Sequence, residues 1–414
     1  MEKKSDVKPA LLLFTKQFPF GKAETYLESE ILVIQNLFSR VYFLPSHISG
    51  ENRIEMPSSF EVKSFDQNWS KKKNKILFQN AFFIFRVLLK EFLFVPSKLV
   101  FVRKINLYKN MLLHKIYVAE QLSEFIAGCG NKVVLCSYWF SDWATVLSVL
   151  KEKRKNISFV SRGHGYDIFD DRFDDAYIPF RCFQLSNVDA VYSVSKKGAT
   201  YLRNKNINPE NIKVSYLGVS DKGVNPFDPN ARFTIVSCSN VNIFKRVDLI
   251  IDVLKNIDFP VDWVHFGDGD QLDYIKEKAK GLPSNIKTDF RGRVSNQEVM
   301  TFYLENSVNL FITTSAMEGL PMTLIEASSF GIPLMGTNVG GIPEIINDET
   351  GMLIEEKIDV NKVASDISSF RSSNKNTPEF RKGVRLFWEN NFYSEKNYIE
   401  LYTELINEFS FNQN

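Results

Sequence analysis

The sequence predicts an α/β protein made of two doubly wound, Rossmann-like domains, and three observations support that class. Its 414 residues exceed one ordinary domain and suit two domains of about 200 residues each. Short apolar runs alternate with helical patterns in both halves, as they do in parallel sheets. The stretch 217–230 is rich in turn-forming residues and is the expected domain boundary.

The strands are predicted from short runs rich in apolar residues. In the first half these runs are 10–14, 41–44, 132–136, 157–160 and 190–194. In the second half they are 233–237, 263–266, 309–312 and 332–335. The final stretch, 391–409, has the amphipathic pattern of a helix. Ligands of open α/β sheets bind at the carboxyl ends of the strands, so functional residues are expected in the loops that follow them.

Composition and charge exclude several classes of protein. Apolar residues make up 44% of the chain and charged residues 24%, which is typical of a folded globular protein. The net charge of +2 gives no global case for nucleic-acid binding, and four cysteines without CxxC spacing argue against zinc or a disulfide framework. The start lacks the apolar core of a signal peptide, and no apolar stretch reaches the ~18 residues of a membrane span. A cytoplasmic protein is therefore expected.

The segment 68–119 departs from the strand–helix rhythm. It holds eleven Lys or Arg residues against one acid, Glu91, and aromatic residues lie between them. This pattern suggests amphipathic helices that lie on an anionic membrane surface. The alternative is that two helices pack on the first domain and their cations are simply solvated. No recognised nucleic-acid-binding module matches the segment.

The segment 308–333 carries the strongest functional signal. An apolar strand is followed by a Gly-Leu-Pro turn, and a helix is predicted to start at about Pro321. The free amides at a helix N-terminus form an anion site. Glu318 and Glu326 lie eight residues apart, so a rise of ~1.5 Å per residue places them about 10 Å apart. A retaining hydrolase needs its carboxylates ~5 Å apart, so the pair suits two ends of one elongated ligand instead.

The string EGLPMTLIEASSFGIP, followed by Gly-Gly-Ile-Pro-Glu at 340–344, resembles the donor-site signature of retaining glycosyltransferases of family 4. The resemblance implies a GT-B fold, with an acceptor domain over 1–218 and a nucleotide-sugar domain over 219–390 that face a cleft. A C-terminal helix over 391–414 would cross back to the first domain. Glu326 would bind the ribose and Glu318 would lie by the donor sugar. The backbone that would hold the diphosphate comprises Gly319, Leu320, Pro321, Met322 and Thr323. The alternative makes Glu318 a helix cap and Glu326 a solvated residue.

The segment 160–167 resembles the R-x-H-G-x-D string of the same family. It places His164 between two glycines after a predicted strand, and glycine lets the backbone approach a ligand closely. By resemblance, His164 contacts the donor sugar near the reacting carbon. Arg162 would contact a phosphate or the acceptor, and Asp167 would orient its neighbours. A purely structural histidine is the alternative.

The segment 237–250 matches the strand–loop–helix in which family members carry G-R-L-x-x-x-K-G. Lys245 falls on the lysine that meets the diphosphate, and a point charge suits developing negative charge. Asn240 stands where the family carries an arginine. Either Arg246 supplies the second cation, or Asn240 donates a neutral hydrogen bond to the donor. A solvated helix start is the alternative for both cations.

Two weaker signals complete the donor side. Gly267 and Gly269 resemble the G-x-G turn of the family, although Gly-Asp-Gly mainly indicates a sharp turn. Arg291 lies in a string similar to the F-x-G-x-V strand beside the nucleotide base. Neither signal identifies the base.

The segment 18–30 resembles the F-P-x-x-G-x-E-x-F-I-x-x-E loop and helix of the family, with a single glycine where a pair is common. It suggests acceptor-side roles for Gly21, Lys22, Glu24 and Thr25. A plain helix start capped by polar residues is an equal alternative.

Together these motifs favour a retaining transferase that moves a hexose-type sugar from a UDP- or GDP-type donor to a glycan or lipid-linked acceptor in cell-surface polysaccharide synthesis. Neither a metal ion nor a cofactor is expected, and the protein is expected in the cytoplasm, with peripheral contact to the inner membrane face through 68–119. The alternatives are a nucleotide-sugar epimerase or phosphorylase of the same architecture, and a non-catalytic partner that binds sugar nucleotides.

Overall fold

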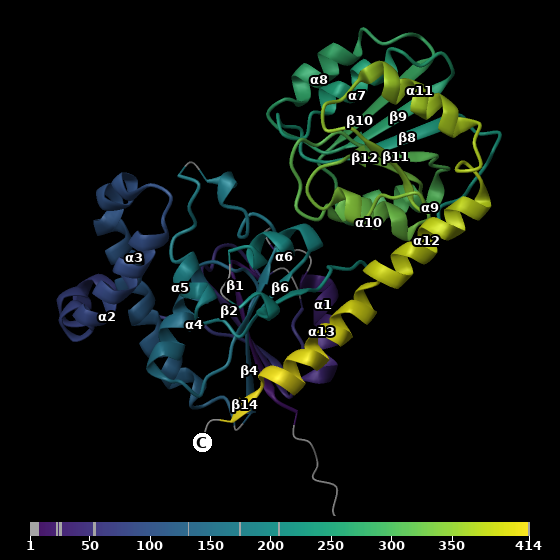
Figure 1. The fold of residues 1–414 in the computed structure, drawn as a ribbon. Helices are drawn as coiled ribbons and strands as arrows, with labels where there is room; N and C mark the ends of the chain where they lie inside the picture. The colour runs from purple at the N-terminus through teal and green to yellow at the C-terminus, as the bar shows by residue number, and fades with distance from the viewer. Residues whose placement is uncertain are drawn as a thin grey trace, which may run out of the picture. The chain divides into compact units, whose positions relative to one another are not determined.

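The chain divides into two compact units in the computed structural model (Figure 1). The first comprises Met1–Ser215 with Tyr398–Asn414, and the second comprises Tyr216–Asn397. The structure describes residues 8–21, 24, 27–52, 55–130, 132–173, 175–205 and 208–412. Each unit is a parallel sheet covered by helices, which confirms the predicted α/β class.

The sheet of the first unit has the order β3-β2-β1-β4-β5-β6-β7, with all neighbours parallel. The last strand of the chain, β14, pairs antiparallel with β4. The strands are β1 Ala10–Thr15, β2 Arg40–Pro45, β3 Phe60–Val62, β4 Lys132–Ser137, β5 Val160–Gly163, β6 Ala190–Ser193, β7 Ile212–Val214 and β14 Phe411–Asn412.

Helices cover both faces of this sheet because its strands are apolar on both sides. On β1, Leu12 faces a core that includes Leu112 and Leu122 of α3, whereas Leu11 and Leu13 face a second core. That second core includes the C-terminal helix. The helices are α1 Leu27–Leu37, α2 Lys73–Phe94, α3 Lys98–Ile126, α4 Asp142–Lys153, α5 Arg181–Leu185, α6 Lys196–Arg203 and α13 Ser394–Phe409, with short 3₁₀ turns at Trp69–Lys72, Asp170–Arg172 and Pro209–Asn211.

The sheet of the second unit is parallel throughout, with the order β10-β9-β8-β11-β12-β13. Its strands are β8 Phe233–Cys238, β9 Val261–Phe266, β10 Ile286–Gly292, β11 Leu310–Thr313, β12 Leu334–Thr337 and β13 Gly351–Ile354. Its helices are α7 Val247–Leu254, α8 Leu272–Ala279, α9 Asn296–Glu305, α10 Met322–Ser329, α11 Val360–Arg371 and α12 Pro378–Phe392, with a 3₁₀ turn at Ile342–Glu344.

Two local predictions are corrected. The strand expected at 157–160 begins only at Val160, because the Phe159 amide donates to the carboxylate of Asp189 (2.8 Å) before the ladder starts. The helix expected over 391–409 starts at Ser394, since α12 ends at Phe392 and Tyr393 is extended. In the described part of the chain, no helix combines the length and apolar composition needed to cross a bilayer.

Candidate functional site

The second unit brings two predicted residues together at its topological switch point. From β8 the chain continues to β9 on one side of the sheet and later returns to β11 on the other. Open α/β sheets bind ligands at such a point, beyond the carboxyl ends of the strands. Lys245 follows β8 and Glu318 follows β11, so both loops meet at this edge.

Lys245 and Glu318 form an ion pair there. The lysine Nζ lies 2.5 Å from Oε1 of Glu318, and the hydroxyl of Ser315 donates to the same oxygen over 2.7 Å. Their side chains are 24% and 12% exposed, so the pair is partly covered yet open to a ligand. The prediction that both residues belong to one site is consistent with this contact, whereas their roles toward a donor stay predictions.

The loop that carries Lys245 is shaped by two neighbours. The carboxamide oxygen of Asn242 accepts the amide of Lys245 (3.1 Å). Arg246 has a left-handed backbone (φ 48°) and precedes α7. Its guanidinium donates to the carbonyls of Thr314 (2.7 Å), Ser315 (3.1 Å) and Glu356 (3.3 Å). Its nitrogens fasten the loop after β11 to the loop after β8, and the role of Arg246 as a cation for the donor stays a prediction.

The loop before α10 is held by a glycine pair. The predicted helix starts at Met322 with Pro321 as its N-cap, as expected. The amide of Gly341 donates to the carbonyl of Gly319 (2.7 Å), and a Cβ on Gly340 would lie 2.1 Å from the carbonyl oxygen of Glu318. Only glycine allows this approach. The first-turn amides of α10, at Met322 and Thr323, lack partners within the helix.

Glu326 lies inside α10 and is partly buried. Burial raises the pKa of its carboxyl to about 7, although the carboxamide of Asn296 on α9 donates to it over 2.8 Å. A freely solvated helix residue would not show this shift. Glu326 is thus a carboxyl whose charge is incompletely compensated by the protein.

The remaining donor-side predictions have local structural explanations. A Cβ on Gly267 would lie 1.8 Å from the carbonyl oxygen of Ser239, so this glycine lets two loops of the unit pack together. Gly269 is similarly close to Val241 (2.2 Å). Asn240 is exposed between these contacts. Arg291 is also exposed, and its Nε donates to Asp289 (2.6 Å). None of these observations assigns a ligand contact.

In the first unit, His164 follows β5 and its ring contacts two aromatic rings at tilted angles. The ring centroids lie 4.8 Å from Tyr138 and 4.5 Å from Trp139, which both follow β4. Neither ring nitrogen has a hydrogen-bond partner within the described residues. Nδ1 lies 3.9 Å from a carboxylate oxygen of Asp167. The ring is thus held by aromatic contacts, and both of its nitrogens are buried.

Asp167 shapes the loop that carries His164. Its carboxylate accepts the amides of His164 (2.7 Å), Gly165 (3.2 Å) and Phe140 (2.8 Å). Burial opposes ionisation, but the hydrogen bonds from His164 and Phe140 hold the pKa of Asp167 below its ordinary value. The carboxylate therefore orients the loop, as predicted for an orienting group, while an acceptor contact is not assigned to it.

The predicted contact of Arg162 with a phosphate or the acceptor is corrected, because this residue does not lie on a surface that a ligand could reach. Its side chain is 0% exposed and pairs with Glu30 of α1, with Nη1 2.6 Å from Oε1. The hydroxyl of Tyr402 on α13 donates to the other oxygen of Glu30 (2.8 Å). Arg162 is an interior residue that joins β5, α1 and α13 in the first unit.

The predicted acceptor-side role of Glu24 is corrected for a similar reason. Its carboxylate accepts the amides of Lys16 (2.7 Å), Gln17 (2.8 Å) and Phe18 (2.8 Å), and the indole of Trp139 donates to it over 2.6 Å. Four donors occupy both oxygens, so Glu24 fastens the loop after β1 instead of binding an acceptor.

The other acceptor-side predictions fall nearby. Gly21 has φ +65°, and a Cβ there would lie 2.7 Å from the side-chain oxygen of Gln17. Glycine is therefore required by the turn itself. Lys22 and Thr25 lie outside the described residues.

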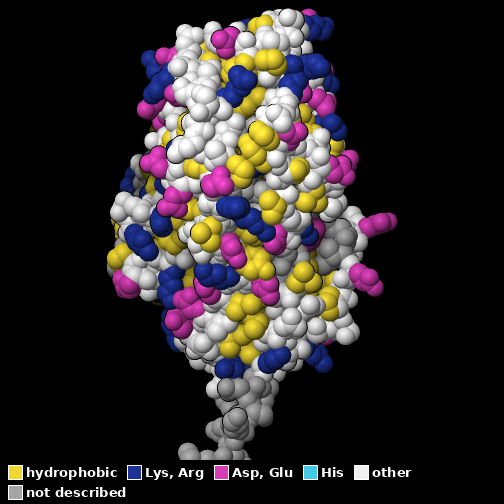
Figure 2. All heavy atoms as spheres, turned by 90° about the vertical axis from the view of Figure 1, so that its right-hand side faces the viewer, with side chains coloured by type: hydrophobic (Ala, Val, Ile, Leu, Met, Phe, Trp, Pro, Cys, Tyr) yellow, Lys and Arg dark blue, Asp and Glu magenta, His cyan; other side chains and the backbone are white. Residues whose placement is uncertain are grey.

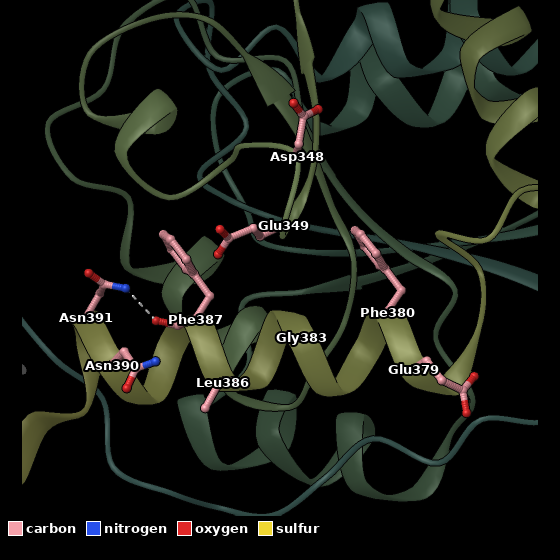
Figure 3. Close-up of a pocket in the computed structure, with 9 residues that line it drawn as sticks. All are labelled: Asp348, Glu349, Glu379, Phe380, Gly383, Leu386, Phe387, Asn390 and Asn391. Carbon is pink, nitrogen blue, oxygen red and sulfur yellow. Dashed lines mark hydrogen bonds between the residues drawn. The ribbon is translucent and has the colours of Figure 1, made fainter.

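A pocket of 510 Å³ lies along α12, and none of the predicted donor residues lines it (Figure 3). Phe380 and Phe387 rise from the same side of the helix toward the loop of Glu349. The residues that line it are Asp348, Glu349, Glu379, Phe380, Gly383, Leu386, Phe387, Asn390 and Asn391. Because it contains none of the motif residues, it does not mark the switch-point site.

Sequence reasoning missed four residues that shape the two sites: Tyr138, Trp139, Asn242 and Asn296. Tyr138 and Trp139 directly follow β4, so their place after a strand was a usable signal. Asn242 lies three residues before Lys245, in a spacing typical of a side chain that caps a turn. Asn296 gave no signal, because its contact with Glu326 depends on how α9 and α10 pack.

The chain is similar to known proteins in sequence and in structure. Residues 224–386 match the family described as "Glycosyl transferases group 1". A component of the phosphatidylinositol N-acetylglucosaminyltransferase of Homo sapiens is 25% identical over 171 residues, which cover 40% of this chain and 35% of that protein. The chain thus spans about a third of the length of this relative.

Two solved structures share the architecture over nearly the whole chain. The lipopolysaccharide outer core galactosyltransferase WaaB has a TM-score of 0.69 at 16% identity and covers 96% of this chain and 99% of its own. HepE of Anabaena, in complex with UDP, has a TM-score of 0.67 at 15% identity with the same coverage. At these identities the likeness shows the fold. The chain therefore has the GT-B fold, and its second unit carries a domain of the glycosyl transferases group 1 family.

Proposed function

We propose that this protein is a retaining glycosyltransferase that moves a hexose-type sugar from a nucleoside diphosphate sugar to a hydroxyl of a glycan or lipid-linked glycan. The observation that carries the proposal is the Lys245–Glu318 ion pair at the switch point of the second unit, next to the N-terminus of α10. The match of residues 224–386 to glycosyl transferases group 1 supports it.

The charges at this site suit a diphosphate leaving group. The first-turn amides of α10 and the positive end of its dipole attract an anion. Lys245 adds a point charge that balances the negative charge developing as the glycosidic bond breaks. Glu318 neutralises Lys245 without a ligand, so an incoming diphosphate competes for the ammonium group. The adjacent carboxylate of Glu318 is proposed to contact the sugar.

Retention is proposed to occur by displacement on the same face of the sugar. The oxygen of the leaving phosphate takes the proton of the acceptor hydroxyl, so no protein nucleophile is required. Catalysis then consists of positioning and charge stabilisation. His164 in the first unit is proposed to contact the donor sugar through a ring nitrogen that has no partner within the described residues.

The donor is proposed to be a UDP-sugar, with a GDP-sugar as the second choice. HepE has been solved with UDP and with UDP-glucose, which supports testing uridine nucleotides first. Because Lys245 and the α10 amides already supply positive charge, transfer is proposed to need no metal and no cofactor. The acceptor is proposed to be a cell-surface glycan, which is supported by the fold shared with WaaB, a lipopolysaccharide outer core galactosyltransferase.

A thermal-shift screen of nucleoside diphosphates and nucleotide sugars tests the proposal, because a ligand that binds the native state raises its melting temperature. One nucleotide should raise it clearly, and Glu326→Ala should reduce the shift. With the matching sugar donor, Lys245→Ala and His164→Ala should mainly lower turnover. An epimerase would convert the donor without any acceptor. Failure of every nucleotide to bind, or unchanged turnover in all three variants, would contradict the proposal.

A further inference from the structure

Helix α2 is apolar on two opposite faces, and one of them is exposed. Ile76, Ile84 and Val87 are buried against the first unit. The exposed apolar side chains are 46% to 87% accessible; they are Phe78, Phe82, Phe85, Leu89 and Leu93. The last four follow the helix kink at Asn80. At 3.6 residues per turn they fall within an arc of about 80°. They therefore form a continuous apolar stripe along the helix.

The start of α3 also exposes apolar side chains. Four apolar side chains there are 39% to 61% exposed: Leu99, Val102, Ile105 and Leu107. We call these four and the five of α2 the hairpin surface. In the first unit, α2 packs on α5 and α3 packs on α4 (Figure 1).

The hairpin is fixed with this surface turned outward. On the opposite side of α2, the buried carboxylate of Glu91 accepts the hydroxyl of Tyr177 (2.7 Å) and the amide of Phe183 (2.7 Å). Phe101 and Tyr108 of α3 lie in the core. Because these contacts hold the inner faces, rotation of either helix would break them. The stripe cannot be buried by a small rearrangement of the unit.

Positive charge is concentrated around the hairpin surface. The segment 68–119 carries a net charge of +10, whereas the whole chain carries +2. Arg86, Lys104 and Lys115 pair with acids of the same unit. Exposed cations without a hydrogen-bond or ion-pair partner in the described part of the chain include Lys71, Lys75 and Arg103. On the face drawn in Figure 2, basic and acidic side chains are interspersed instead.

We propose that the hairpin surface docks on an anionic lipid bilayer. Soluble proteins rarely leave a large contiguous apolar patch uncovered unless it binds something. Aromatic and aliphatic side chains bordered by unpaired cations fit the boundary between acyl chains and anionic headgroups. A second copy of this chain is the less suitable occupant, because a symmetric dimer would bring two cationic segments together. The helices would lie on the bilayer, since neither is suited to cross it.

Vesicle flotation without any sugar donor tests this surface independently of transferase activity. Wild type should float with vesicles containing phosphatidylglycerol and much less with pure phosphatidylcholine. Phe78→Ser, Phe82→Ser and Phe85→Ser combined should weaken binding by at least about a hundredfold, because even partial insertion of one such side chain contributes about tenfold. Lys71→Glu, Lys75→Glu and Arg103→Glu combined should weaken it by at least about a hundredfold, at about fivefold or more per charge.

Matched controls carry the same changes elsewhere. Leu32→Ser, Tyr274→Ser and Ile399→Ser combined remove exposed apolar side chains outside the hairpin surface. Lys276→Glu, Lys357→Glu and Lys382→Glu combined change the same charge on the second unit. Both controls should float as wild type does.

The proposal is overturned if the Phe variant still floats, if controls and hairpin variants are affected alike, or if wild type does not bind vesicles containing phosphatidylglycerol. A concentration-dependent dimer that the Phe variant abolishes, without lipid binding, would assign the surface to a second copy.

Discussion

The switch points of the two units differ in what occupies them. In the first unit, the loops after β1 and β4 meet around Glu24, whose carboxylate is occupied by three backbone amides and the indole of Trp139. In the second unit, the loops after β8 and β11 meet around the partly exposed pair of Lys245 and Glu318. The carboxylate of Glu24 accepts from four donors of the protein. Glu318 is paired instead with Lys245, whose ammonium group a ligand can bind in its place.

The difference indicates that an acidic side chain beyond the C-terminal ends of parallel strands can have either of two roles. When backbone amides occupy it, it fixes the shape of a loop, and its removal should cost stability. When its partner is a partly exposed lysine, its removal should change ligand binding and leave folding nearly unaffected. Substitution of Glu24 should therefore reduce stability, whereas substitution of Lys245 should reduce function.

The largest effect is expected from Arg162→Met in the first unit. The substitution leaves the carboxylate of Glu30 buried without its cation, and breaking such a pair typically costs about 3–5 kcal/mol. Urea denaturation should show this loss in the free energy of unfolding. The double variant Glu30→Leu with Arg162→Met removes both charges and should recover part of it. Wild-type stability of the single variant would show that the pair is not structural.

Lys245→Ala in the second unit should show the opposite behaviour. Turnover should fall by about 10²–10³, as is typical when one charge-stabilising group is removed. The free energy of unfolding should change by no more than about 1 kcal/mol, because a partly exposed ion pair contributes little. Steady-state kinetics and urea denaturation measure the two quantities, with Lys276→Ala as control. Unfolding without a specific loss of turnover would remove the distinction between the units.

Glu24→Gln should have a smaller effect than Arg162→Met. The amide nitrogen of glutamine cannot accept, so at least one of the four donors loses its partner, at a cost of about 1–3 kcal/mol. Urea denaturation measures the loss, and Glu51→Gln on the exposed surface serves as control. If nucleotide or acceptor binding changed while stability did not, Glu24 would belong to the ligand site after all.

The last prediction concerns the pH dependence of Glu326. Burial raises the pKa of its carboxyl to about 7, so the folded protein holds this proton more tightly than the unfolded chain does. The free energy of unfolding should therefore fall as pH rises from about 4.5 to about 7. Glu326→Gln should lack this component. Denaturation of both proteins across this range measures the difference, and parallel curves would contradict the raised pKa.

Nucleotide binding offers a second measurement of the same group. A ribose hydroxyl donates more strongly to a carboxylate than to a neutral carboxyl. Binding of the nucleotide sugar found in the ligand screen should therefore tighten as pH rises through about 7, and the Gln variant should show no such change.

The sequence by itself determined much of the second unit. Short apolar runs located β8, β9, β11 and β12, and the Gly-Leu-Pro turn located the start of α10. The resemblance of the motifs to those of the glycosyltransferase family also implied that Lys245 and Glu318 share a site. These features depend on local patterns, and strand adjacency then brings the loops together at one edge. In the second unit, the local sequence patterns and the tertiary contacts therefore lead to the same site.

Only the tertiary structure decided which polar residues face inward. Arg162 and Glu30 are 132 residues apart in sequence, and nothing near Arg162 shows that its charge is neutralised in the interior. Arg246 and Lys245 are adjacent cations, yet one binds backbone carbonyls and the other reaches Glu318. The composition of α2 does not indicate which of its two apolar faces is buried. The physical reason is the same in each case: burial and pairing depend on groups supplied by distant segments, which a local pattern does not contain.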